Sequence, residues 1–386
     1  MTPRERMLIA LRHGIPDRVP CAPDISIMIP IKLKKRPFWD FYFDFDNIDK
    51  IYDLYANKKI MYAYVDAIKY FGIEGWAFYG QPIIKSEDVE YKQKIIDRRS
   101  DRIIARTTIS TPEGSLWAET VYPIDNPPFP IRKYIKDFER EFKFLKYFYP
   151  RLDEIDFSDV ADMKDYVGEY GTTYIFVNPP SLVDLDFLID GGLGKIGLIY
   201  YDYPELIRKY KEMHENWSME YVKKIIEANL VDGIGTGGSG LMTWQSPKIT
   251  RDLSLDGLKQ ITKICKEHGV ISHLHCCGLS KELVKMCAEE TDLDVIEPLE
   301  GPPQGDVDLK EIKRKYGKKL ALKGNLHTSK VMLSNVKVVE KAAIKCIDDA
   351  AEGGGYILST GDQCGRDTPF ENIFKLVEVC ETYGRY

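Results

Sequence analysis

The sequence has no long apolar run and no excess of positive charge. No stretch approaches the roughly 18 uncharged apolar residues that a membrane-spanning helix requires, and residues 1–20 carry charges from the first turn onward, unlike a secretion signal. Lys and Arg number 54 against 60 Asp and Glu, and the two signs are interspersed. A basic face for nucleic acid is therefore not expected. We expect a cytoplasmic protein that binds neither membranes nor nucleic acid.

Disordered and fibrous classes are also excluded, because 44% of the 386 residues are hydrophobic and no repeat or low-complexity tract is present. The length suits two or three ordinary domains or one enlarged α/β barrel. There are eight cysteines, and a chain with a large core has no need of disulfides, so a reducing compartment is expected. Five of them sit in apolar or helical contexts typical of buried hydrophobic residues, at positions 21, 265, 287, 346 and 380.

Short apolar runs alternate with helical patterns from about residue 174 onward. Strands are expected at 174–178, 231–235, 270–275, 294–297, 320–323 and 356–359. In the helical segment 205–230, apolar residues recur every three or four positions, as on one face of a helix. This alternation predicts parallel strands with crossover helices. We expect a (β/α)8 TIM barrel that forms a single domain over residues 1–386.

The first 170 or so residues are less regular. The segment 18–24 is expected to be the first barrel strand, and strands at 102–109 and 115–122 predict a β-hairpin. We expect residues from about 30 to 160 to form an elaborated N-terminal region with this hairpin, 102–122, inserted. Six aromatic residues between 38 and 45 indicate core packing or an aromatic wall for a planar substrate.

Two helix starts carry a capping-box pattern. Thr2 precedes a proline and lies three residues before Glu5, and Thr368 is related in the same way to Glu371. Such pairs cap helix N-termini reciprocally. Helices are therefore expected to begin at both places.

The strongest signal for chemistry is the segment 273–278, His-Leu-His-Cys-Cys-Gly, at the carboxyl end of a predicted strand. Residues two apart on an extended chain point to the same side. His275 and Cys277 can therefore converge on one metal ion, and His273 with His275 is an alternative pair. Zinc accepts imidazole and thiolate ligands, and catalytic zinc sites usually have three protein ligands and an open position.

A third metal ligand is expected from another strand end, because barrel active sites collect residues from several strands. Cys364 follows the last predicted strand and is the first candidate, with Asp362 and Glu300 as oxygen alternatives. Asp362 and Glu300 are also our candidates for catalytic residues. Glu297 follows the strand after the His-Cys strand, and it could bind zinc, orient His275 or cap the next helix.

Further strand ends supply candidates for ligand binding. The run 235–240, Gly-Thr-Gly-Gly-Ser-Gly, lacks the Lys-Ser/Thr of a phosphate-binding loop. We expect Gly237 and Gly238 to permit close approach of a flat corrinoid or a substrate. Asn325 is a candidate for cofactor contact or for a turn role. Three residues are expected to line the substrate pocket: Asp24, Asn178 and His273.

Several motifs taken together resemble the uroporphyrinogen decarboxylase superfamily. They are TPRER (2–6), PDRVP (16–20), HCCG (275–278), GN (324–325), and ILSTG (357–361) leading to TPFEN (368–372). The His-x-Cys-Gly strand end is similar to the corrinoid-dependent methyltransferase branch, such as methylcobamide:coenzyme M methyltransferases, where that His, that Cys and a later Cys hold zinc. The decarboxylases instead carry Arg-Gln-Ala-Gly-Arg after the first strand. Residues 21–26 read CAPDIS here, so the acetate groups of a porphyrinogen would lack bidentate partners.

This resemblance implies a chemistry that depends on the third ligand. The later cysteine of the thiol-methylating enzymes aligns without gaps with Asp362, and Cys364 lies two residues further on. Two thiolates suit zinc to holding a substrate thiolate, whereas one thiolate with an oxygen ligand leaves a stronger Lewis acid that can polarise an ether oxygen.

The function that the resemblance implies is zinc-dependent transfer of a methyl group from a small methylated donor, a methoxylated aromatic, to the cobalt of a corrinoid. A partner protein would carry that corrinoid, because the sequence has no Asp-x-His-x-x-Gly motif for binding one. Methyl transfer to a thiol such as coenzyme M and metal-free decarboxylation stay open as alternatives. A homodimer is compatible with the sequence.

Overall fold

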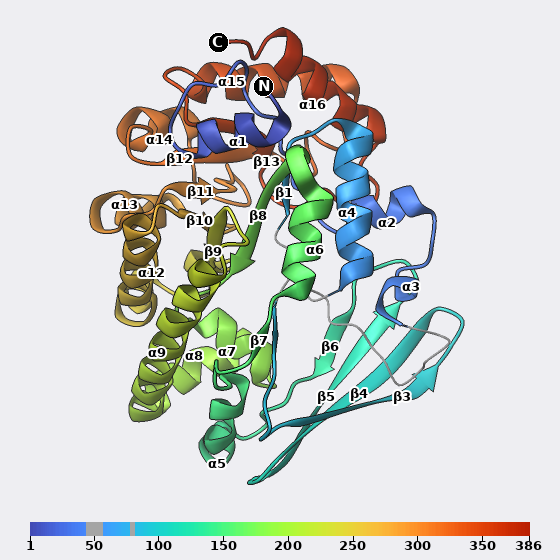
Figure 1. Ribbon diagram of the computed structural model, residues 1–386, viewed down its shortest axis with the longest axis vertical. Coiled ribbons are helices and arrows are strands. Elements are labelled where there is room, and N and C mark those ends of the chain that lie inside the picture. The colour runs from blue at the N-terminus through green and yellow to red at the C-terminus, as the bar shows by residue number, and fades with distance from the viewer. Residues whose placement is uncertain (44–56, 78–81) are drawn as a thin grey trace.

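The computed structural model describes residues 1–43, 57–77 and 82–386, and a curled parallel β-sheet lies at its centre (Figure 1). Seven strands follow one another in the sheet: β1 (Gly75–Ala77), β8 (Gly171–Phe176), β9 (Gly233–Gly237), β10 (Ile271–His275), β11 (Val295–Glu297), β12 (Ala321–Leu326) and β13 (Tyr356–Thr360). The six strands expected from residue 174 onward are all present, each within three residues of its predicted ends. The α/β TIM-barrel class is therefore confirmed.

An extended segment around Cys21 takes the eighth position, between β13 and β1. Leu358 of β13 donates its N–H to the carbonyl of Pro20 and accepts from the N–H of Ala22, both at 2.9 Å. On the other side, the N–H of Glu74 donates to the Cys21 carbonyl at 2.9 Å. The predicted first strand thus closes the barrel by joining its last strand to its second.

The buried Glu74 side chain strengthens this closure. Its carboxylate accepts the backbone N–H of Cys21 at 2.6 Å and pairs with the guanidinium groups of Arg6 and Arg18 at 2.7 and 2.8 Å. Because a buried carboxylate is stable only when it is paired and hydrogen-bonded, the two arginines are part of the barrel closure.

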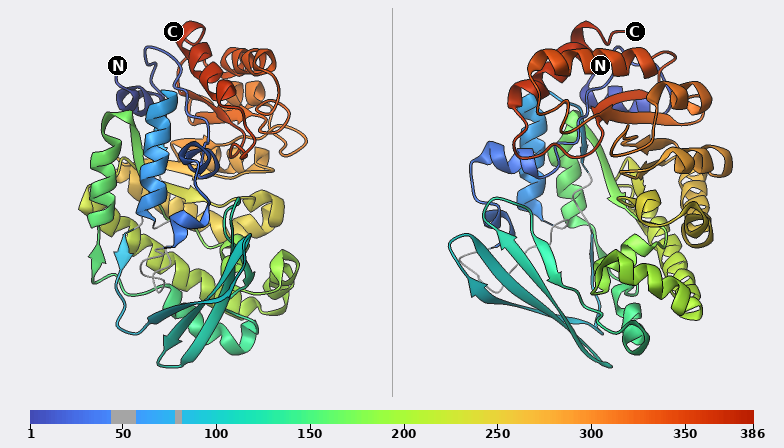
Figure 2. Two further views of the ribbon diagram at one scale, coloured as in Figure 1. Left: turned by 90° about the vertical axis from the view of Figure 1, so that its right-hand side faces the viewer. Right: turned by 180° about the vertical axis from the view of Figure 1, so that it is seen from behind.

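Helices surround the barrel on its outside, and both chain termini lie at the same end of the molecule (Figure 2). The longer helices are α1 (Pro3–Leu11), α4 (Lys58–Phe71), α6 (Ser158–Val167), α8 (Gly192–Asp202), α9 (Pro204–Ala228), α12 (Leu255–Glu267), α13 (Lys281–Glu290), α14 (Leu309–Tyr316), α15 (Val336–Ala350) and α16 (Phe370–Thr382). Shorter elements are α2 (Met28–Lys34), α3 (Trp39–Tyr42), α5 (Phe138–Glu141), η1 (Phe142–Phe148), η2 (Gly168–Tyr170), α7 (Leu182–Leu188), α10 (Leu241–Trp244), α11 (Pro247–Ile249), η3 (Thr250–Ser254) and the strand pair β2 (Ile83–Ile84) and β7 (Ile155–Asp156). The helix predicted at 205–230 is α9.

The two expected capping boxes differ. At α1 both hydrogen bonds between Thr2 and Glu5 form, as predicted. Helix α16 instead begins at Phe370 after Pro369, with no side-chain cap. Pro369 therefore occupies the cap position and Thr368 lies one residue outside it, so the second capping prediction is wrong.

The predicted hairpin is the centre of a four-stranded antiparallel sheet, made of β3 (Glu90–Arg98), β4 (Arg102–Thr111), β5 (Gly114–Pro123) and β6 (Phe129–Arg132). Its two edge strands, β3 and β6, were not predicted from the sequence. This sheet lies in the half of the molecule toward which β8 points (Figure 1). Arg366, in the loop after β13, pairs with Asp125 between β5 and β6 at 2.8 Å. The inserted sheet is thereby tied to the carboxyl end of the barrel.

The described part of the aromatic stretch at 38–45 is core. Phe38, Phe41, Tyr42 and Phe43 are all buried in the largest hydrophobic cluster, and residues 44 and 45 lie outside the described residues. The core-packing interpretation is therefore the one that the described residues support.

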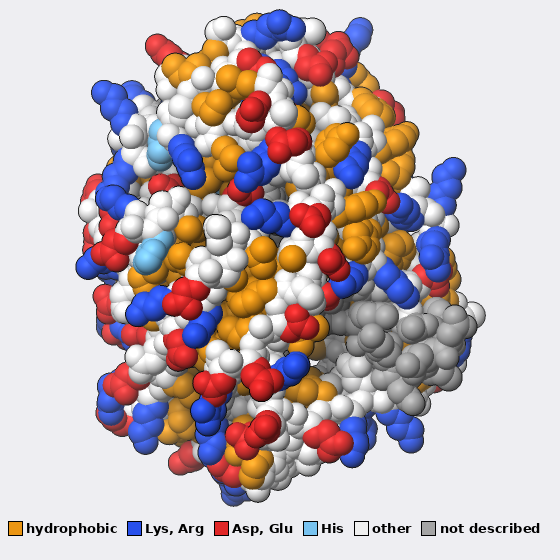
Figure 3. Space-filling view, viewed as in Figure 1, with side chains coloured by type: hydrophobic (Ala, Val, Ile, Leu, Met, Phe, Trp, Pro, Cys, Tyr) orange, Lys and Arg blue, Asp and Glu red, His pale blue; other side chains and the backbone are white. Residues whose placement is uncertain are grey.

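Acidic and basic side chains are interspersed on the face shown in Figure 3. Within the described residues, no helix combines the length and the apolar character that crossing a bilayer would take.

Candidate functional site

The carboxyl end of β10 brings His275 and Cys277 together, as their spacing predicts. The strand ends at His275, and the N–H of Cys276 continues the pairing by donating to the Glu297 carbonyl at 2.9 Å. Because successive side chains alternate in direction, the Cys276 side chain faces away from His275 and Cys277. It is fully buried, and burial raises the pKa of its thiol to about 12. Cys277 stays partly exposed and its side chain interacts with the His275 imidazole.

Glu297 holds the other side of that imidazole. The Nδ1 atom of His275 lies 3.1 Å from Oε1 of Glu297, and the second carboxylate oxygen, Oε2, pairs with the ammonium of Lys323. Burial pushes the pKa of Glu297 up, but Lys323 and the hydrogen bond to His275 outweigh it and hold the pKa below its usual value. The pKa of His275 is raised, because its contacts with Cys277 and Glu297 outweigh the cost of burial.

His273 lies one layer deeper, inside the barrel. Its ring stacks on Trp76, with 5.4 Å between centroids, and meets Tyr174 edge to face at 5.2 Å. It is 1% exposed, and burial lowers its pKa to about 4. His273 is therefore a neutral interior residue, and its contact with a substrate stays a prediction.

Glu300 reaches the same strand end from the loop after β11. Its Oε2 accepts the backbone N–H of Gly278 at 2.5 Å. A Cβ built on Gly361 would come within 3.3 Å of Cγ of Glu300, so Glu300 also borders the loop that carries Asp362. Burial raises the pKa of Glu300, and Asp362 adds to that effect.

Asp24 joins this group from the closing segment of the barrel. Its backbone N–H donates to the Thr360 hydroxyl at 3.0 Å and its carbonyl accepts the N–H of Cys364 at 2.7 Å. Burial, together with Glu297 and Asp362, raises the pKa of Asp24 to about 7 against the opposing effect of Lys323.

Cys364 lies two residues after Asp362, and its thiol is close enough to Asp24 and Asp362 for both carboxyl groups to act on it. The side chain is fully buried against the Thr360 and Thr368 side chains, and burial raises its pKa to about 12. In the described part of the chain no three His, Cys, Asp or Glu side chains are grouped closely enough to hold a metal ion. Of the predicted ligands, the structure therefore brings His275 and Cys277 together and leaves the third undecided.

Gly237, the last residue of β9, and Gly238, which follows it, have different surroundings. A Cβ on Gly237 would lie 2.4 Å from the His275 carbonyl oxygen, and the residue has a φ of +100°. The N–H of Gly238 donates to the same carbonyl at 2.9 Å, and a Cβ there would meet open space. Gly237 thus allows β9 to pack closely against β10, and the absence of a side chain at Gly238 leaves open space at the end of β9.

Both candidate asparagines are held by neighbouring groups. The amide of Asn325 donates to the Leu299 carbonyl at 2.8 Å, and Asn325 lines a pocket of about 240 Å³ bordered by α14 and α15. The amide of Asn178 donates to Asp184 at 3.2 Å, and the Asn178 carbonyl contacts Nε2 of His214 at 2.9 Å. Their cofactor and substrate roles stay predictions.

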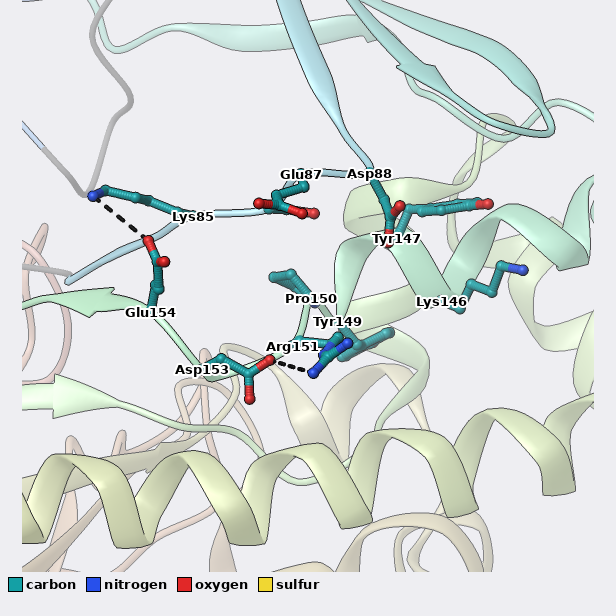
Figure 4. Close-up of a pocket in the computed structure, with 11 residues that line it drawn as sticks. Lys85, Glu87, Asp88, Lys146, Tyr147, Tyr149, Pro150, Arg151, Asp153 and Glu154 are labelled. Atoms are coloured by element: carbon teal, nitrogen blue, oxygen red, sulfur yellow. Dashed lines mark ion pairs between the residues drawn. The ribbon is translucent and has the colours of Figure 1, made fainter.

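A larger cavity, of about 830 Å³, lies between the β2–β3 connection and the segment from η1 to β7 (Figure 4). Its walls carry the ion pairs Lys85–Glu154 and Arg151–Asp153, at 3.8 and 2.7 Å (Figure 4). Residues of the candidate site are not among those that line it. The candidate site is therefore assigned from its chemistry and not from cavity size.

Two further residues of the site, Lys323 and Trp76, were not predicted from the sequence. The Lys323 ammonium lies 3.7 Å from the centre of the Trp76 ring. A lysine in the otherwise apolar run at 320–323 was the available signal for a charged group inside the barrel.

Comparisons with known proteins agree with this fold. Residues 191–383, half of the chain, match the family model of uroporphyrinogen decarboxylase (URO-D). Uroporphyrinogen decarboxylases of two Coxiella burnetii strains, Dugway 5J108-111 and RSA 493, are each 30% identical over 77 residues. That match spans 20% of this chain and 21% of those proteins.

Among solved structures, a methyltransferase from Methanosarcina mazei has a TM-score of 0.64 at 15% identity, with 99% of both chains covered. A B12-independent methionine synthase from Shewanella sp. W3-18-1 has a TM-score of 0.44 at 13% identity, with 95% of this chain and 98% of that one covered. The first of these likenesses concerns the fold alone. The family-model match, over a barrel with this strand order, shows that the chain belongs to the uroporphyrinogen decarboxylase family.

Proposed function

We propose that this protein is a zinc-dependent methyltransferase that moves a methyl group from a small methylated donor to the cobalt of a corrinoid carried by a partner protein. The observation that carries the proposal is the pairing of His275 and Cys277 at the carboxyl end of β10. The barrel shared with the Methanosarcina mazei methyltransferase is consistent with it.

The donor set fits zinc. An imidazole and a thiol two residues apart share one strand end, and Glu297 occupies Nδ1 of His275, which leaves Nε2 for a metal. The third donor would be Cys364, Asp362 or Glu300. Of these, Glu300 accepts a hydrogen bond from Gly278, the residue that follows Cys277. When bound, zinc supplies Lewis acidity to the heteroatom that carries the methyl group.

The charges around the site favour a donor that is not an anion. Asp362 acts on the carboxyl groups of both Asp24 and Glu300. Among the described residues, the positive groups acting on these two are Lys323 and His275 for Asp24, and His275 for Glu300. Lys323 is already paired with Glu297. A neutral methoxylated aromatic meets less repulsion here than a sulfonate-bearing thiol such as coenzyme M.

In the proposed reaction the ether C–O bond breaks and its electron pair stays on oxygen, while the methyl carbon passes to Co(I). The phenolate product takes a proton from solvent. Whichever of Asp362 and Glu300 does not bind zinc is left to orient the donor. Gly238 leaves open space at the end of β9, where a flat ligand can approach the backbone.

A metal-free decarboxylase is the second candidate, because the family model and the 77-residue match both bear the decarboxylase name. Its carboxylated substrate would need cationic partners, and residues 21–26 contain no arginine. We therefore rank it second.

The two functions are separated by one assay with purified protein. Zinc content is measured first, and methyl transfer to free cob(I)alamin is then followed spectrophotometrically with neutral methoxylated aromatics, carboxylated ones, methylamines and methanol. We expect about one zinc per chain and turnover of neutral donors in preference to carboxylated ones. Absence of zinc together with CO2 release from a carboxylated substrate would establish the decarboxylase instead.

A further inference from the structure

Lys323 is the most deeply buried basic residue of the site region, with 0% of its surface exposed. Its ammonium has two partners, the Oε2 atom of Glu297 and the face of the Trp76 ring, 3.7 Å from the ring centre. Burying such a charge pair is unfavourable compared with packing apolar side chains of the same volume. Barrel stability alone therefore does not explain it.

The three residues stand in a row across neighbouring strands. His275 of β10 is the register partner of Glu297 of β11. The β11–β12 register pairs Ile296 with Leu322, so Glu297 and Lys323 are the next residues along. Residues at the same level of neighbouring strands point to the same side of the sheet. The register therefore places the Lys323 ammonium, the Glu297 carboxylate and the His275 imidazole next to one another.

The carboxylate of Glu297 is divided between its two neighbours. Oε2 faces Lys323, and Oε1 lies 3.1 Å from Nδ1 of His275 and 3.8 Å from Nε2 of His273. A carboxylate fixed at one oxygen cannot rotate away from the group at the other. A neutral imidazole that donates its Nδ1–H to a carboxylate presents an unprotonated Nε2, the atom that a metal ion can bind.

We propose that Lys323 is a positioning residue, which anchors Glu297 so that His275 presents Nε2 to a metal ion held with Cys277. This inference rests on the proposed function, because it concerns the same metal position. It assigns to Lys323 and Glu297 the selection of the His275 tautomer and ring orientation, with neither residue binding the metal.

The test measures metal binding rather than turnover. Zinc affinity is determined by competition with a chromogenic chelator, and the visible absorption bands of the Co(II)-substituted protein report ligand geometry. For Lys323→Met we expect zinc affinity to fall about 10- to 100-fold and the Co(II) bands to shift. Lys313→Met is the matched control, since Lys313 is a half-buried lysine on α14 that hydrogen-bonds the Gly354 carbonyl before β13. It should bind zinc as the wild type does.

Lys323→Met leaves a buried carboxylate unpaired and could fail to fold, so the double variant Lys323→Met/Glu297→Gln is measured beside it. It removes both charges, and nothing then holds the amide toward the imidazole, so the same loss of affinity is expected. Wild-type zinc affinity and Co(II) bands in the double variant would overturn the positioning role. Failure of the wild-type protein itself to bind zinc would instead overturn the proposed function.

Discussion

Glu300 accepts a hydrogen bond from the backbone N–H of Gly278, with 2.5 Å between Oε2 and N, although the two residues follow different barrel strands. The carboxylate is thereby fixed beside the residue that follows Cys277. The Cys364 thiol is fully buried beside Thr360 and Thr368, and within the described residues no hydrogen bond joins it to this strand end.

From this relationship we expect Glu300→Gln to lose zinc, with affinity reduced at least about tenfold, because an amide oxygen is a weaker ligand than a carboxylate. Cys364→Ser should keep its zinc. Metal content after dialysis against a chelator checks both, and Asp362→Asn completes the comparison. An empty site in Cys364→Ser with a filled one in Glu300→Gln would show that the loop rearranges to give a two-thiolate site.

Gly237 at the end of β9 and Gly238 just after it should respond differently to the same substitution. Gly237→Ala places a methyl group 2.4 Å from the His275 carbonyl oxygen at a positive φ, which we expect to destabilise the fold by about 1–3 kcal/mol. In Gly238→Ala the added methyl group meets open space, so the free energy of unfolding should stay within about 0.5 kcal/mol of the wild-type value. Urea unfolding of both variants gives the comparison. Equal stabilities would mean that β9 shifts to accept the methyl group.

The buried Asp24 carboxyl should contribute stability that the metal-free protein loses as pH rises from about 4 to 7. Its pKa is about 7 when folded against an ordinary 3.8, so the folded state binds the proton more tightly and stability is lost as that proton dissociates. The loss amounts to up to about 4 kcal/mol and should level off above pH 7. Asp24→Asn should remove this part of the slope. Parallel urea curves from pH 4 to 8 test it, and identical slopes for both proteins would contradict the assignment.

Removing the charge of Glu74 should weaken the barrel closure. The variant Glu74→Gln leaves Arg6 and Arg18 without their buried carboxylate, and we expect a loss of about 3–5 kcal/mol. Glu205→Gln removes a carboxylate from the exposed pair with Arg208 and serves as the control, with no measurable change expected. Thermal unfolding is the readout. A Glu74→Gln protein as stable as the control would mean that backbone hydrogen bonds alone close the barrel.

The sequence predicted what depends on local pattern. Strand–helix alternation located six barrel strands, and the two-residue spacing of His275 and Cys277 placed them on one side of a strand end. Strand β1 was not predicted, because its three residues, Gly75–Ala77, are too few to show an alternation of apolar and polar side chains. The edge strand β3 is mostly exposed and charged, so it has no apolar alternation to detect.

The contacts that organise the site depend on register between strands distant in sequence. The Lys323–Glu297–His275 row follows from how β10, β11 and β12 align, which no local pattern encodes. The surroundings of the Cys364 thiol, beside Thr360 and Thr368, likewise include Asp24, which is distant from it in sequence. Its loop position suggested a metal ligand, and that role stays a prediction.

The bridge between Cys21 and Leu358 has a consequence for how the chain folds. The segment around Cys21 pairs with β13, which is the last strand of the chain. One of its edges therefore has no partner until nearly the whole chain has been synthesised. Until then the growing sheet has an open edge, and contacts so far apart in sequence form slowly. We therefore expect barrel closure to be a late step, and a nascent chain that stalls before β13 to be the species most exposed to aggregation and to chaperones.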